Sequence, residues 1–110
     1  MGGPVKGDVV VVLFPFSDLS SAKKRPALVL AAPGGDDVIL CQITSRLVSD
    51  RYAILITQDD FASGSLRGES NVRPTRIFTA DRKIIQYTAG QLKENCIAKI
   101  IDRVTGILRS

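Results

Sequence analysis

Blocks of apolar residues with the length of β-strands alternate with short polar blocks along the first part of the chain. Val9–Phe14 is β-branched and apolar, which is typical of a buried strand. The polar residues 17–24 predict a loop. Arg25–Ala32 and Val38–Thr44 are two further apolar runs around the turn residues Pro33–Asp37. This arrangement predicts an antiparallel hairpin.

The pattern is less regular after residue 50. Tyr52–Thr57 predicts another strand, and residues 58–70 predict a long irregular link. Ser70–Thr79 predicts an extended segment, in which Pro74 favours an edge strand or a bend. Ile84–Thr88 predicts one last short strand.

The period changes near the C-terminus, where apolar residues recur at spacings of three and four. This spacing predicts an amphipathic helix, with the apolar positions Leu92, Cys96, Ile97, Ile100, Ile101, Val104, Ile107 and Leu108. Five or six short strands and one terminal helix predict a mainly β domain that spans residues 1–110. We expect a small curled sheet or barrel with the helix packed on it.

A cluster of cations precedes the second apolar run. Lys23, Lys24 and Arg25 stand directly before Pro26, and a proline restricts the residue before it to extended geometry. Because a proline is tolerated at the start of a strand, Pro26 is expected at the first position of a strand. Arg25 is then a permanent cation at the mouth of that strand.

Composition narrows the chemistry. The net charge of +4 favours an anionic partner. The chain has no histidine, which excludes Ser-His and Cys-His catalysis and metal sites of the Cys/His type. Cys41 and Cys96 lie among apolar residues, so we expect buried thiols in a reducing cytoplasm, with a disulfide as the less favoured alternative. No apolar run has the length of a membrane span.

Two motifs resemble a known family. Residues Gly7–Asp18, followed by Lys24–Leu30, resemble the MazF/PemK family of bacterial toxins, and Ile43–Ser45 matches the family's pair of hydroxyls. The resemblance extends over Lys6–Leu108. It implies a small SH3-like β-barrel with a C-terminal helix, assembled as a cytoplasmic homodimer. It also implies cleavage of single-stranded mRNA without a metal or another cofactor, and an antitoxin partner with an acidic, disordered tail.

The resemblance also implies roles for individual residues. Arg25 and Thr44 match the catalytic positions, and Ser45 matches the neighbouring hydroxyl. Cleavage without metal uses the 2′-OH of the RNA as nucleophile and leaves a cyclic phosphate and a 5′-OH. A guanidinium can bond two phosphate oxygens at once, so electrostatic stabilisation is the expected role of Arg25.

Several other residues are candidates for RNA contact. Lys23 and Lys24 are expected either to contact backbone phosphate or to be solvated charges, and Arg46 and Arg76 are proposed from charge alone. Phe16 either anchors the first loop or stacks on a base. The last candidate, Arg73, occupies the position of an Arg-X-Asp motif in the PemK-like branch, but here the sequence reads Arg73-Pro74-Thr75 and the carboxylate is missing.

Two alternative functions remain open from the sequence. The missing histidine and carboxylate are compatible with a degenerate toxin that binds RNA or antitoxin without cutting. A gyrase-inhibiting toxin of similar fold is less favoured, because such toxins use a C-terminal tryptophan and this chain contains none.

Overall fold

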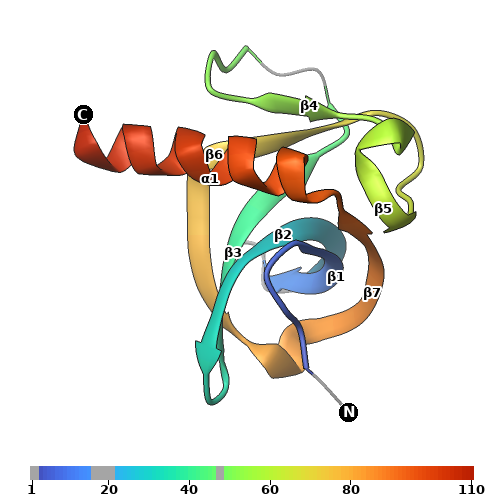
Figure 1. Ribbon diagram of the computed structural model, residues 1–110. Helices are drawn as coiled ribbons and strands as arrows, with labels where there is room; N and C mark the ends of the chain where they lie inside the picture. The colour runs from blue at the N-terminus through green and yellow to red at the C-terminus, as the bar shows by residue number, and fades with distance from the viewer. Residues whose placement is uncertain (1–2, 16–21, 47–48) are drawn as a thin grey trace.

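A computed structural model describes residues 3–15, 22–46 and 49–110 of the chain. The described strands form one strongly curled antiparallel sheet in the order β4-β6-β3-β2-β1-β7-β5 (Figure 1). A single α-helix among the described residues, α1, follows the last strand. The bounds are β1 Asp8–Pro15, β2 Ala22–Gly34, β3 Asp37–Thr44, β4 Ile54–Ile56, β5 Phe61–Gly64, β6 Ser70–Asp81, β7 Ile85–Leu92 and α1 Glu94–Arg109.

The mainly β, barrel-like fold with one C-terminal helix is therefore confirmed. The predicted hairpin is β2 and β3, which pair with Ala27 opposite Gln42 and Val29 opposite Leu40. Its turn is Gly35–Asp36. Gly34 and Gly35 both have positive φ (118° and 69°), which residues with a side chain rarely adopt.

The curled sheet has a buried apolar cluster on each face, because successive side chains of a strand point to opposite sides. The first cluster includes Val9, Leu28 and Ile43 and lies under α1, β4 and β5. The second includes Val10, Val12, Ala27, Val29, Val38 and Leu40. The central strands β1, β2 and β3 therefore hold apolar residues at consecutive positions.

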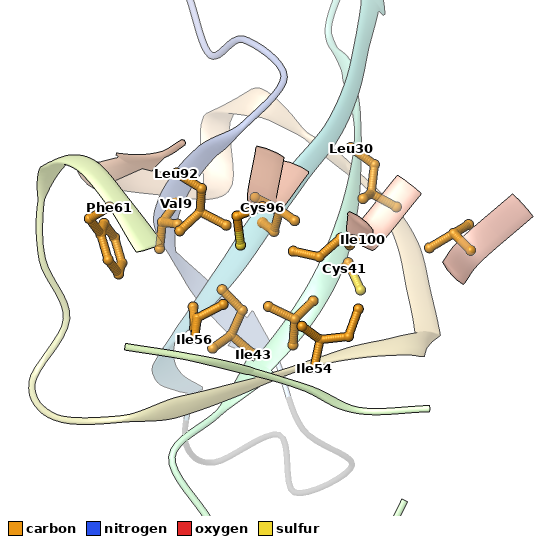
Figure 2. Packing of buried hydrophobic residues seen from close by; sticks show 13 residues of the cluster. Val9, Leu30, Cys41, Ile43, Ile54, Ile56, Phe61, Leu92, Cys96 and Ile100 are labelled. Carbon is orange, nitrogen blue, oxygen red and sulfur yellow. The ribbon is translucent and has the colours of Figure 1, made fainter. Parts of the chain in front are cut away.

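Helix α1 packs on the first cluster through residues four positions apart. Cys96, Ile100 and Val104 are buried, and Figure 2 shows Cys96 and Ile100 above Cys41, Ile43 and Ile54 of the strands. Both cysteines are buried and free, as predicted. α1 has 16 residues and a charged outer face, so the described part of the chain contains no helix suited to crossing a bilayer.

The start of β2 differs from the prediction. The polar segment was expected to be a loop as far as residue 24, but β2 begins at Ala22 and includes all three cations. Pro26 is the fifth residue of the strand rather than its first, and it pairs with Val11 of β1. The cations fit in a strand because Lys23 and Lys24 are exposed there. Residues 17–21 of the predicted loop lie outside the described residues.

The second half of the chain also contains more regular structure than predicted. The expected link 58–70 contains a 3₁₀ turn, Gln58–Asp60, and the strand β5, which pairs with β7. The segment around Pro74 is not an edge strand, because β6 lies between β4 and β3. Pro74 instead falls where the β3–β6 register shifts, between the pairs Cys41–Ile77 and Ile43–Val72. This irregularity fits the predicted bend.

Candidate active site

The ladder between β2 and β3 stops before either strand ends. Its last pair at this end is Ala27–Gln42. Beyond it, residues 22–26 of β2 pair with β1 alone, whereas Ile43 and Thr44 pair with β6. We call residues 22–26 and 43–46 the split end of the sheet.

Pro26 accounts for the position of the split. The carbonyl of Val29 accepts a hydrogen bond of 2.9 Å from the N–H of Gly7, on the β1 side of β2. Backbone groups alternate in direction along a strand, so an N–H at position 26 would point to β3. Proline has no N–H to donate there, and the ladder to β3 ends beside it.

Arg25 and Thr44 lie on the two sides of this split. Each is two residues beyond the last pair, so both side chains belong to the face that carries Ala27 and the second apolar cluster. Arg25 lies opposite Val12 of that cluster in β1. Arg25 and Thr44 are both half-buried. The sheet thus presents a guanidinium and a hydroxyl on one face, beside a gap in its backbone pairing.

Ser45 is separated from this pair. Ser45 and Lys24 line a cavity of about 650 Å³ together with Val11 and Pro26. Lys24 belongs to the opposite face from Arg25 because the two residues are adjacent in a strand. The two hydroxyls that the sequence suggested as a pair therefore have different surroundings. Lys23, which is exposed, shares the face of Arg25.

The turn that follows β3 holds the Thr44 hydroxyl. Its Oγ1 accepts a hydrogen bond of 3.2 Å from the backbone N–H of Arg46. The carbonyl of Arg46 in turn accepts a hydrogen bond of 3.5 Å from Nδ2 of Asn71. Asn71 belongs to β6 and pairs there with Thr44 of β3. Since Oγ1 serves as an acceptor, its own proton is still available for donation to a ligand. The side chain of Arg46 is exposed.

Arg73 has a carboxylate partner that the sequence did not suggest. Its Nε donates to Oδ2 of Asp50 at 3.2 Å, and the two side chains are 22% and 10% exposed. Asp50 also accepts from the backbone N–H of Tyr52 at 2.9 Å. This bond, with a smaller contribution from Arg73 and Arg76, lowers the pKa of Asp50 below its usual value, although burial acts in the opposite direction.

This ion pair changes the interpretation of Arg73. A carboxylate was considered absent because Thr75 stands where the family motif has an aspartate, yet Asp50 supplies one from 23 residues earlier. No local pattern links positions that far apart. Arg73 thus uses one guanidinium nitrogen, Nε, to bind Asp50. Arg76 is exposed and lies close enough to lower the pKa of the same carboxylate.

The described residues provide neither a reactive thiol nor a metal site as an alternative to the Arg25 and Thr44 pair. The Cys41 thiol donates to the carbonyl of Arg73 at 2.9 Å, and burial raises its pKa to about 12, so it is not a nucleophile. The ranges 3–15, 22–46 and 49–110 contain no group of three or more His, Cys, Asp and Glu residues that could hold a metal. Phe16 lies outside the described residues.

Comparison with known families adds to this geometry. Residues 5–108 match the family of PemK-like, MazF-like toxins of type II toxin-antitoxin systems. The chain belongs to this family. The match spans both strands of the split end and the helix, which agrees with the extent of the sequence resemblance. No curated protein gives a significant match.

Solved structures show the same toxin fold at low identity. MazF of Deinococcus radiodurans (Form-I) matches with a TM-score of 0.77 and 17% identity over 100% of both chains. An endoribonuclease of a Mycobacterial species, in complex with its cognate antitoxin, matches with a TM-score of 0.73 and 18% identity over 97% of this chain and 96% of that one. A MazE-MazF complex of D. radiodurans (Form-III) has a TM-score of 0.77 and 18% identity, with 98% of each chain covered.

Proposed function

We propose that this protein is the toxin of a type II toxin-antitoxin pair and that it cuts single-stranded mRNA without a metal ion. One observation carries the proposal: Arg25 and Thr44 share one face of the sheet, on either side of the split between β2 and β3. Family membership makes a ribonuclease the activity to test first.

The reaction follows from the chemistry of RNA. The 2′-oxygen attacks the adjacent phosphorus and loses its proton, while the bond from phosphorus to the 5′-oxygen breaks and that oxygen takes up a proton. The products are a 2′,3′-cyclic phosphate and a 5′-OH. Negative charge grows on the two non-bridging oxygens during the attack, so groups that stabilise this charge accelerate the reaction.

Arg25 supplies this stabilisation. Its planar guanidinium donates two parallel hydrogen bonds to the non-bridging oxygens. It does not serve as a proton donor, because an arginine pKa lies above about 12. The Thr44 hydroxyl donates a further hydrogen bond to the same phosphate, oriented by the turn to Arg46. Ser45 lies on the face opposite to Arg25 and Thr44, next to Lys24, so its hydroxyl is not assigned to the same phosphate.

The other cations position the strand. Lys23 follows the face of Arg25 and contacts backbone phosphate, as do the exposed Arg46 and Arg76. Arg73 contacts phosphate through the nitrogens that Asp50 leaves available. Phosphate contacts of this kind raise affinity and make it sensitive to salt, at a slope of about 0.7 per contact for a single strand.

We also propose the partners implied by the family. A cognate antitoxin binds through an acidic segment, consistent with the net charge of +4. One structural neighbour is an endoribonuclease in complex with its cognate antitoxin, and another is a MazE-MazF complex. The toxin acts as a homodimer in the cytoplasm, where its mRNA substrate is found.

Removal of Arg25 tests the proposal. Wild-type protein incubated with one long RNA in EDTA should cut at discrete positions, and primer extension gives those positions. Arg25→Ala should reduce the rate by roughly 10²–10³, the loss expected when one donor to a developing oxyanion is removed. Arg109→Ala is the matched control, since this exposed arginine lies at the end of α1.

Three results would contradict the proposal. Equal rates for Arg25→Ala and wild type would remove the assigned role of Arg25. Cutting that EDTA abolishes would show that a metal takes part. Binding of RNA with no cutting of any RNA would favour a degenerate binding module of the same fold.

A further inference from the structure

The cavity beside Lys24 lies on the other face of the split end, and Ser45 is its only lining residue among the predicted catalytic residues. Its volume of about 650 Å³ is within the range of small-ligand sites, roughly 300–1,000 Å³. Strands β1, β2 and β7 form one wall, and the link between β5 and β6 forms the other.

One wall is apolar and has an aromatic rim. Tyr87 of β7 pairs with Val11 of β1, and Val11 pairs with Pro26 of β2, so the three residues form a row across neighbouring strands. Tyr87 is 56% exposed, although its ring is large and apolar. An exposed ring that lines a cavity offers a flat stacking surface, and such surfaces bind nucleic acid bases.

The other features of the cavity favour an anionic ligand. Lys24 and Arg67 line it, and none of its described lining residues is acidic. Ser70 also lies in the wall and is only 3% exposed. Two cations and an exposed aromatic ring together match the phosphate and the base of a nucleotide.

We propose that this cavity binds the nucleotide next to the cleaved bond, with its base against Tyr87 and its phosphate against Arg67 and Lys24. The proposal rests on the proposed ribonuclease function and extends it to substrate recognition. Lys24 and Ser45 in the cavity are chain neighbours of Arg25 and Thr44 on the opposite face. In this arrangement the cleaved phosphate lies against Arg25 on one face and the RNA strand bends around the split end of the sheet to place the next nucleotide in the cavity.

The test measures binding, so it does not depend on cutting. The probe is a fluorescent RNA of about nine nucleotides with 2′-fluoro groups throughout, a length within known single-strand site sizes. It has no 2′-OH and cannot be cut. Its sequence is taken from a mapped cleavage site, or is random if no RNA is cut. In a series of probes, each base in turn is removed.

Tyr87→Leu and Arg67→Ala are compared with wild type. In wild type, loss of the base at one position should weaken binding about tenfold, within the usual range for one stacked base. The same loss should change binding by about twofold or less in Tyr87→Leu, because the ring that held the base is gone. Arg67→Ala should weaken every probe and reduce the salt slope by about 0.7.

Matched controls sit outside the cavity. Leu55→Ala removes an exposed strand side chain from β4, and Arg109→Ala removes an exposed cation from α1. Both should keep the wild-type pattern of base dependence.

The other possible results either contradict the proposed subsite or show that it does not depend on the ribonuclease function. If Tyr87→Leu keeps the wild-type dependence on every base, the subsite is wrong even where RNA is cut. If base dependence follows Tyr87 but no RNA is cut, the cavity binds a nucleotide and the ribonuclease function is wrong. An acidic peptide of alternating Glu and Leu is titrated in parallel. Peptide binding that needs Arg67, without any base dependence at Tyr87, would overturn the proposal in favour of a protein segment in the cavity.

Discussion

Strands β2 and β3 behave differently in their two halves. In the paired half, Leu28, Val29, Leu40 and Cys41 are at most 1% exposed and fill both apolar clusters. In the split half, the same strands carry Lys23, Lys24, Arg25 and Thr44, which are exposed or half-buried. In the paired half, the backbone groups are hydrogen-bonded between the strands and the side chains are buried, so no group there can reach a ligand. In the split half, the polar side chains are accessible to a ligand.

The largest expected effect on stability lies in the paired half. Leu28→Ala should lower the free energy of unfolding by about 2–5 kcal/mol, because it leaves a cavity in the cluster beneath α1. Denaturant unfolding measures this change. The cutting rate of the remaining folded protein at low temperature should match that of wild type, since Leu28 lies outside the split end.

Leu55→Ala serves as the control for the apolar truncation, because Leu55 is 51% exposed and should cost well under about 1 kcal/mol. If Leu28→Ala slowed cutting as strongly as Arg25→Ala while remaining folded, the distinction between the two halves would be wrong.

The Asp50–Arg73 ion pair holds the segment after β3 onto β6, and its removal should have the next largest effect. Asp50→Asn should destabilise the protein by about 1–3 kcal/mol at pH 7, because the Tyr52 N–H and the Arg73 guanidinium lose a charged acceptor. Asp102→Asn, at an exposed position of α1, should cost little.

The pH dependence of that difference follows from the pKa of Asp50. The folded pKa is lowered, so near the ordinary aspartate pKa of about 3.9 the unfolded chain binds more protons than the folded one. The advantage of wild type over Asp50→Asn is therefore complete well above that pH. It should shrink as the pH falls through the lower, folded pKa. Unfolding curves between pH 7 and pH 3 test this, and a difference that grew in acid would contradict it.

A smaller effect is expected at Thr44. Thr44→Val removes the hydroxyl and nearly preserves the shape, and should slow cutting about tenfold, equivalent to about 1.4 kcal/mol. Thr44→Ser keeps the hydroxyl and should retain most of the rate. Single-turnover cutting in EDTA gives both values. If Thr44→Val and Thr44→Ser were equally slow, the methyl group rather than the hydroxyl would be the feature that matters.

The smallest effect is expected in thiol labelling of the two buried cysteines, Cys41 of β3 and Cys96 of α1. Burial raises the pKa of Cys41 to about 12 and also raises the pKa of Cys96, so both thiols stay protonated at pH 8. Neither thiol should react with a disulfide reagent until the protein unfolds. Rapid labelling of the native protein would show that the core opens more readily than its packing indicates.

The paired half of β2 and β3, together with β1 and α1, could be predicted from the sequence because the signals are local. Val9–Phe14 is a continuous apolar run, the hairpin has turn residues at its centre, and the helix has apolar residues at spacings of three and four. The structure confirms all three elements. The extra strand β5 could not be found in this way, because four residues, Phe61–Gly64, form a strand only by pairing with β7.

The split end was predictable in its residues but not in its geometry. Arg25 and Thr44 were identified through family resemblance, and Pro26 through its effect on the backbone. That Pro26 lies inside a strand, and that Ser45 shares a cavity with Lys24, depends on which partner each strand has. The Asp50–Arg73 pair joins positions 23 residues apart, and the lining of the cavity with Tyr87 and Arg67 comes from segments that are far apart in the sequence.

A double-mutant cycle of Arg25→Ala and Thr44→Val in single-turnover cutting tests the central claim most directly. If the guanidinium and the hydroxyl stabilise the same phosphate across the split, the double variant should lose clearly less than the product of the two single losses. Losses that simply multiply would show that the two residues act independently, and two single variants with wild-type rates would contradict the account.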